Sequence, residues 1–157
     1  MAKAIKPGDP APKFDLPTAG GGRVSLASLK GKRVVLYFYP KDDTQACTQE
    51  ALNFTEKASD FAAANTVVLG VSRDTVAKHD KFAAKYGLTL LLGSDVEGVA
   101  CEAYGVWVEK SMYGRQYMGV ERTTFLIDPK GRISHVWRKV RVRGHVDDVL
   151  SKINEAP

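Results

Sequence analysis

The stretch Tyr37-Phe-Tyr-Pro-Lys-Asp-Asp-Thr-Gln-Ala-Cys47-Thr-Gln-Glu-Ala carries a cysteine from the end of an apolar segment to the start of an amphipathic one. Residues 34–39 read VVLYFY, an unbroken apolar run typical of a strand that is buried on both faces. Pro40 ends this strand, and Thr44 is a good N-cap for a helix. Apolar residues then recur at steps of three and four, which predicts one continuous helix past Ala51, Phe54, Ala58 and Phe61.

Cys47 falls in the first turn of this predicted helix. Unpaired backbone N–H groups and the positive end of the helix dipole favour a thiolate over a thiol at that place. A helix terminus alone supplies about 1 kcal/mol or less, so full activation of the thiol requires a second positive group. Arg122, at the mouth of another predicted strand, is the candidate because a guanidinium keeps its charge at any relevant pH.

The segments after Cys47 predict an α/β fold. Residues 66–72 (TVVLGVS) form a second buried strand, so the first unit is β-α-β with parallel strands. A hairpin follows later in the chain, because Asp128-Pro-Lys-Gly131 is a turn signature between two apolar runs. The other predicted elements are a helix over 75–86 capped by Gly87, a short strand over 88–92, a helix from the capping box at 94–97 to about residue 104, the hairpin strands over 123–127 and 132–137, and a last helix over 146–154.

This order, a parallel β-α-β unit followed by β-β-α, predicts a thioredoxin-like fold with a mixed central sheet flanked by helices. The 157 residues, 44% of them hydrophobic, suit one domain over 1–157. We expect a soluble, cytoplasmic protein, because the N-terminus lacks a long apolar core and no run of eighteen apolar residues occurs. The net charge of +5 is modest, and the alternating basic residues of 138–143 are typical of a solvated strand, so we expect no nucleic-acid partner.

Pro40, Thr44 and Cys47 match the pattern Pro-x3-Thr-x2-Cys of the peroxiredoxin active site, and Arg122 stands where that family carries its arginine. The chain resembles the peroxiredoxin Q, or bacterioferritin comigratory protein, subfamily. The resemblance runs nearly end to end, through Gly8-Asp-Pro-Ala-Pro-Lys-Phe-Asp-Leu16, Tyr37-Phe-Tyr-Pro-Lys-Asp-Asp43, Tyr104-Gly-Val-Trp107, Lys110-Ser-Met-Tyr-Gly114 and Thr124-Phe-Leu-Ile-Asp128. It implies an added N-terminal β-hairpin, which we expect over residues 14–26.

The resemblance implies a thiol peroxidase that needs no cofactor. Cys47 would attack hydrogen peroxide or an alkyl hydroperoxide and become a sulfenic acid, with Thr44 and Arg122 holding the peroxide oxygens and Pro40 shielding the thiol. Glu50, one turn after Cys47, could orient Arg122 through a bidentate pair or simply complement the helix N-terminus. Thioredoxin or a glutaredoxin-type protein would be the reductant, and the subfamily favours a monomer. The alternative hypothesis is a non-catalytic redox sensor or chaperone-like binding module.

Two departures from the subfamily pattern affect these expectations. The chain reads Thr44-Gln-Ala-Cys47 where the subfamily usually reads Thr-Pro-Gly-Cys, a change that keeps the polar groups of the site. Leu52 stands where many relatives place a resolving cysteine, and Phe82 marks a second place where some relatives carry one. Cys101 therefore has two interpretations, a small core residue or a long-range resolving thiol. The three histidines share no metal-ligand spacing with one another or with the cysteines, which predicts no metal.

Overall fold

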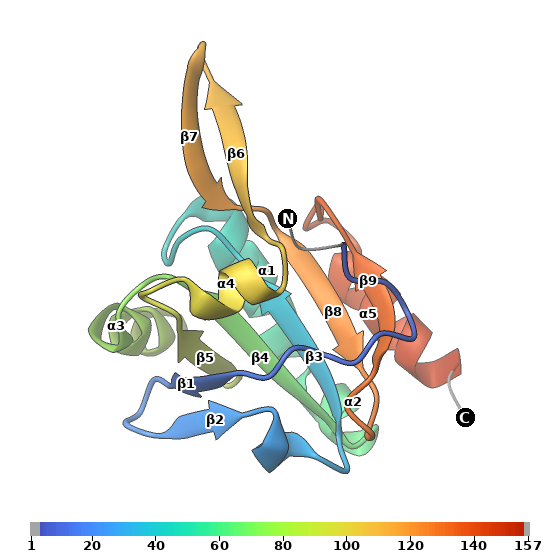
Figure 1. Cartoon of the computed structure of the whole chain (residues 1–157). Helices are drawn as coiled ribbons and strands as arrows, with labels where there is room; N and C mark the ends of the chain where they lie inside the picture. Colours follow the sequence, from blue (N-terminus) through green and yellow to red (C-terminus); the bar gives the residue numbers. More distant parts are fainter. Residues whose placement is uncertain (1–3, 156–157) are drawn as a thin grey trace.

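A mixed five-stranded sheet forms the centre of the molecule, in the strand order β5-β4-β3-β8-β9 (Figure 1). The structure is a computed structural model that describes residues 4–155. Its parallel part consists of β3 (Arg33–Phe38), β4 (Thr66–Ser72) and β5 (Leu91–Ser94). β8 (Thr123–Ile127) pairs antiparallel with β3, and β9 (Ile133–Trp137) pairs antiparallel with β8. The central strand β3 is therefore hydrogen-bonded on both sides.

Side chains of β3 alternate between two apolar clusters, one on each face of the sheet. Val35 and Tyr37 pack on the face that carries four helices, and Val34 and Leu36 pack on the other face. The first face is covered by α1 (Gln45–Glu56), α2 (Ala58–Ala63), α3 (Val76–Tyr86) and α5 (His145–Glu155). The second face is covered by β1 (Asp15–Pro17), β2 (Arg23–Ser25), the short helix η1 (Ala27–Leu29) and α4 (Val99–Ala103).

These layers confirm the predicted α/β class, the mixed sheet and the N-terminal hairpin, whose strands pair antiparallel from Asp15–Ser25 to Pro17–Arg23. The buried strand over 66–72, the strand over 123–127 and the α3 helix lie where the sequence predicted them. Gly87 ends α3 in the left-handed conformation, at φ 64°. Gly131, in the turn between β8 and β9, also has a positive φ, of 86°, which glycine adopts without a steric penalty.

The prediction of one helix through residue 61 was wrong, because the chain leaves the helical conformation at Lys57 (φ −100°, ψ 15°). Phe54 in α1 and Phe61 in α2 nevertheless pack in the same cluster, with ring centroids 5.7 Å apart. The apolar stripe therefore continues across the break. Hydrophobic periodicity alone does not register such a break.

The capping box predicted at 94–97 was also wrong. Ser94 is the last residue of β5, and its hydroxyl donates to the carbonyl of Asp74 at 2.6 Å. The carboxylate of Asp95 instead accepts the N–H groups of Ala100 and Cys101, so α4 begins four residues later than predicted. The short strand predicted over residues 88–92 lies further along the chain, as β5 over Leu91–Ser94.

A two-stranded ribbon that the sequence did not predict projects from the body of the molecule (Figure 1). It consists of β6 (Trp107–Met112) and β7 (Arg115–Val120), and most of its residues are exposed. Its return strand leads directly into Arg122 and β8. Among residues 4–155, none of the helices combines the length and the apolar character needed to cross a bilayer.

Candidate active site

Cys47 lies in the first turn of α1, just beyond the carboxyl end of the central strand β3. Thr44 takes the N-cap position with extended backbone angles (φ −92°, ψ 158°), and its carbonyl accepts the N–H of Thr48 at 2.8 Å. The Cys47 residue is only 2% exposed. The order strand, short loop and helix therefore places the sulfur at a helix N-terminus and almost out of contact with solvent.

Arg122 reaches this sulfur from the neighbouring strand. Thr123 pairs with Phe38 at the end of β3, so the residue before it lies beside the loop that leads to α1. The Arg122 Nη2 donates to the Cys47 Sγ at 3.3 Å. A positively charged donor therefore lies in direct contact with the sulfur.

The same guanidinium holds Glu50. Arg122 Nη1 donates to Glu50 Oε1 at 2.7 Å, a single hydrogen bond rather than a bidentate pair. Glu50 is fully buried, and its other carboxylate oxygen has no hydrogen-bond partner among the described residues. Burial raises the pKa of Glu50 to about 7, because it outweighs the opposing effect of Arg122. Near neutral pH, Glu50 therefore changes its charge one hydrogen bond away from the group that contacts Cys47.

We expect the ionisation of Glu50 to lower the stability of the folded protein. Because its folded-state pKa lies above the ordinary value of 4.5, the folded protein binds more protons than the unfolded chain between about pH 4.5 and 7. Stability from this group is then lost as the pH rises through that window, by about 3 kcal/mol in total. Urea unfolding at several pH values gives the free energy of unfolding of the wild type and of Glu50→Gln, and the difference between the two proteins measures this loss. A difference that does not change with pH would contradict the prediction.

Thr44 and Pro40 are exposed residues of the segment that precedes Cys47. The Thr44 hydroxyl donates to the carbonyl of Lys41 at 2.9 Å and accepts no helix N–H, so it is not a side-chain cap. This hydroxyl is exposed on the loop before Cys47. Pro40 borders a cavity of about 490 Å³ at the base of the β6–β7 ribbon, together with Arg73, Val96, Trp107, Lys110, Tyr117, Met118, Gly119 and Val120.

Cys101 lies on the opposite face of the sheet from Cys47. It is part of α4 and packs in the cluster formed with β1 and β2, whereas Cys47 packs in the cluster of the four helices. Cys101 is 0% exposed. Burial raises the pKa of its thiol, and a hydrogen bond to Asp95 raises this pKa further. Both cysteines are free thiols. The sheet would have to open for the two sulfurs to meet.

The histidines do not occupy equivalent environments. His145 is buried, its Nε2 lies 2.8 Å from the Thr124 hydroxyl, and burial lowers its pKa to about 4, which leaves the ring neutral at pH 7. His79 is grouped with Asp42 and Asp74, whose ligand-type atoms lie within 4.8 Å of one another. Sequence spacing gave no sign of this group. These side chains are joined by hydrogen bonds within the group and its surroundings, so their proximity does not by itself call for a metal.

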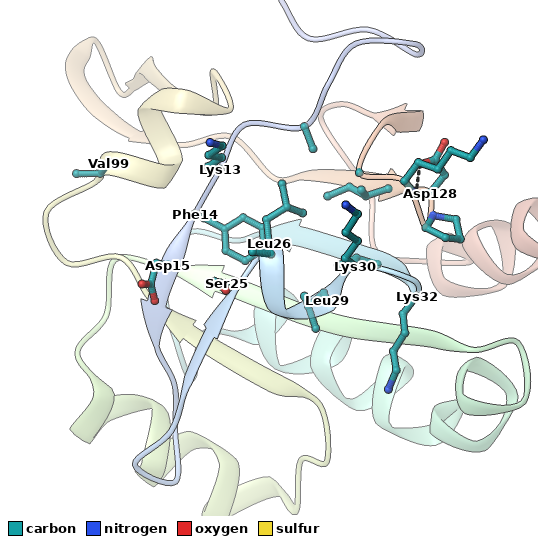
Figure 2. A pocket seen from close by; sticks show the side chains of 17 residues that line it. Lys13, Phe14, Asp15, Ser25, Leu26, Leu29, Lys30, Lys32, Val99 and Asp128 are labelled. Atoms are coloured by element: carbon teal, nitrogen blue, oxygen red, sulfur yellow. Dashed lines mark hydrogen bonds between the residues drawn. The ribbon is translucent and has the colours of Figure 1, made fainter.

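A larger cavity, of about 710 Å³, lies at the other end of the central strands (Figure 2). Val34, at the start of β3, and Ile127, at the end of β8, belong to its lining, as do Phe14 and Leu26. Cys47 follows the opposite end of β3. The cavity is therefore remote from the thiol, and the contact between Arg122 and Cys47 lies outside it.

Comparison with known proteins gives consistent matches. Residues 7–136 match the AhpC/TSA family. The chain is 51% identical to a putative peroxiredoxin bcp of Coxiella burnetii, over 96% of this chain and 99% of the relative. It is 42% identical to peroxiredoxin Bcp of Escherichia coli, over 96% of this chain and 97% of the relative.

Solved structures agree with these sequence matches. A cysteine-to-serine variant of PrxQ from Xylella fastidiosa is similar at a TM-score of 0.93 and 40% identity, over 98% of both chains. Bacterioferritin comigratory protein of Xanthomonas campestris, in a structure concerned with its alkyl peroxide reduction activity, is similar at a TM-score of 0.87 and 44% identity, over 90% of both chains.

Proposed function

This chain belongs to the AhpC/TSA family, in its peroxiredoxin Q or bacterioferritin comigratory protein subfamily, and is a thiol peroxidase; we propose that Cys47 is the residue that attacks the peroxide. The observation that carries this assignment is the contact of Arg122 with the Cys47 sulfur at a helix N-terminus. Among residues 4–155, no cationic side chain is hydrogen-bonded to the Cys101 sulfur, and burial raises the pKa of the Cys101 thiol.

In the proposed reaction, the Cys47 thiolate attacks the terminal oxygen of the peroxide. An S–O bond forms as the O–O bond breaks, the leaving oxygen takes a proton to become water or an alcohol, and the cysteine becomes a sulfenic acid. Arg122, the Thr44 hydroxyl and N–H groups of the first turn would hold the two oxygens in line and stabilise the developing charge. The thiolate supplies both electrons, so the reaction balances without a cofactor. Pro40 would limit access of water to the sulfur.

We propose that an external thiol, supplied by thioredoxin or a glutaredoxin-type protein, reduces the sulfenic acid. Leu52 occupies the position of the nearby resolving cysteine of many relatives, and Cys101 lies across the sheet. The oxidised Cys47 would form a mixed disulfide with the reductant and be released by a second thiol. The subfamily resemblance supports a monomer, and the two free cysteines support a reducing compartment such as the cytoplasm.

Mass spectrometry of the intact protein tests this proposal. After one equivalent of peroxide we expect a mass gain of one oxygen, and with excess peroxide and no reductant a gain of two, because no internal thiol competes for the sulfenic acid. A glutathione or thioredoxin pulse after the first equivalent should yield a mixed disulfide on Cys47. A loss of two protons, with a tryptic peptide that links Cys47 to Cys101, would show a long-range resolving thiol instead.

A cysteine at position 52 is expected to restore internal resolution. Five residues along a helix correspond to about 7.5 Å of rise, which exceeds the usual Cα separation of a disulfide, so the start of α1 must unwind for the bond to form. Leu52 is half-buried in α1. Leu52→Cys should convert the gain of one oxygen into a loss of two protons and should suppress over-oxidation. Ala58→Cys, on α2, is the matched control and should still over-oxidise; equal behaviour of the two variants would refute the prediction.

A further inference from the structure

A buried histidine lies behind the loop that connects β3 to α1. His79, on α3, is 0% exposed, and both of its ring nitrogens have partners. Nδ1 lies 2.6 Å from Oδ2 of Asp42, and Nε2 lies 2.9 Å from the carbonyl oxygen of Gly93. Asp42 belongs to the loop itself, two residues after Pro40 and two before Thr44. The imidazole therefore joins the active-site loop to both α3 and β5.

The two partners orient the imidazole ring. A backbone carbonyl only accepts hydrogen bonds, so Nε2 donates to Gly93. The 2.6 Å contact between Nδ1 and the Asp42 carboxylate is a short hydrogen bond in a buried site, where such bonds are stronger than in water.

Further hydrogen bonds fix the orientation of Asp42. Its other carboxylate oxygen accepts the hydroxyl of Tyr39 at 2.6 Å, and its backbone N–H donates to Asp74 Oδ2 at 2.9 Å. Asp74 in turn accepts the hydroxyl of Ser72 at 2.6 Å. The groups that face Asp42 therefore come from the residue after β3, from α3 and from the segment after β4. Asp42 has little freedom to move while the His79 contact is intact.

We propose that His79 is a positioning residue, which holds Asp42 so that Pro40 and Thr44 lie correctly over Cys47. The loop is short, and Asp43 takes a left-handed conformation, with φ 59°, that the surrounding contacts must maintain. If Asp42 were released, the loop could move, and Pro40 and Thr44 would move with it. The inference rests on the proposed role of Cys47 and adds a residue that contacts neither the sulfur nor the peroxide.

Two variants of His79 separate its two hydrogen bonds. The amide nitrogen of Asn corresponds to Nδ1, so His79→Asn keeps a donor toward Asp42, whereas the longer His79→Gln places its donor toward Gly93. We expect His79→Asn to react with peroxide within about threefold of the wild-type rate and His79→Gln to be slower by about 30-fold, since a misplacement of about 1 Å costs up to about 10²-fold. Single-turnover stopped-flow measurement gives both rates.

Alkylation of Cys47 by iodoacetamide distinguishes positioning from a general loss of structure. It requires the thiolate but no alignment of two oxygens, so its rate should not fall below about half of the wild-type rate in either variant. Equal slowing of the peroxide reaction in the two variants, or slowing of alkylation in parallel with it, would overturn the proposal. Peroxide consumption by Cys47→Ser at the wild-type rate would instead refute the proposed function, independently of His79.

Two further variants keep the test valid if His79→Gln does not fold. Tyr39→Phe removes the hydrogen bond from the Tyr39 hydroxyl to Asp42 but leaves the imidazole of His79 in place. It should slow the peroxide reaction by about threefold to tenfold without slowing alkylation. Lys81→Ala changes an exposed residue of α3 and should react as the wild type does. Tyr39→Phe at the wild-type peroxide rate would overturn the proposal.

Discussion

Cys47→Ser is expected to abolish peroxide consumption, while Cys101→Ser leaves the first oxidation step intact. Only Cys47 combines a helix N-terminus with a guanidinium in contact with its sulfur. A serine hydroxyl at that place stays protonated at neutral pH and has no adjacent base to activate it, so the rate should fall by about 10³-fold or more. Stopped-flow measurement of a single turnover with hydrogen peroxide reports this step alone, without any contribution from the reductant.

The Cys101→Ser variant is the matched control for loss of a thiol. Its side chain is fully buried among apolar residues, so the variant is expected to lose some stability while its rate of reaction with peroxide is unchanged. Equal loss of the peroxide reaction in the two cysteine variants would refute the assignment of Cys47. Thermal unfolding of both proteins shows whether a slow variant is also an unfolded one.

The sequence was sufficient for the fold because its strands are short, apolar and separated by clear turn signals. Residues 66–72 and 123–127 are β4 and β8 with the predicted bounds, and the solved relatives confirm the thioredoxin-like class. The β6–β7 ribbon was missed for a physical reason. It projects into solvent and buries little on either face, so its sequence has no apolar alternation by which it could be recognised.

The candidate site was only partly accessible from the sequence. A cysteine in the first helical turn is a local feature, and Arg122 was found from the chemistry that a thiolate requires. The pairing of His79 with Asp42 joins residues 37 positions apart, and no sequence spacing connects His79 to the segment that contains Asp42. The raised pKa of Glu50 was also hidden, because it depends on how completely α1 is buried against the sheet.

Arg122→Ala is expected to slow the reaction with peroxide by about 10³-fold. Arg122 donates both to the Cys47 sulfur and to Glu50, and each charge-assisted hydrogen bond of this kind contributes about 1.5–3 kcal/mol. Its removal takes a positive donor from the sulfur and from the breaking O–O bond. Arg122→Lys should recover only part of the rate, because a point charge cannot contact the sulfur and the carboxylate in the same fork geometry.

The double variant Arg122→Ala/Glu50→Gln separates the two roles of the guanidinium. In Arg122→Ala alone, Glu50 is left fully buried without its cation, which destabilises the protein for a reason unrelated to the reaction. Replacing Glu50 with glutamine removes that buried carboxylate, so the double variant should regain stability but still react slowly. Recovery of the wild-type rate in the double variant would mean that Arg122 acts only by neutralising Glu50, and its assignment as the activator of Cys47 would be wrong.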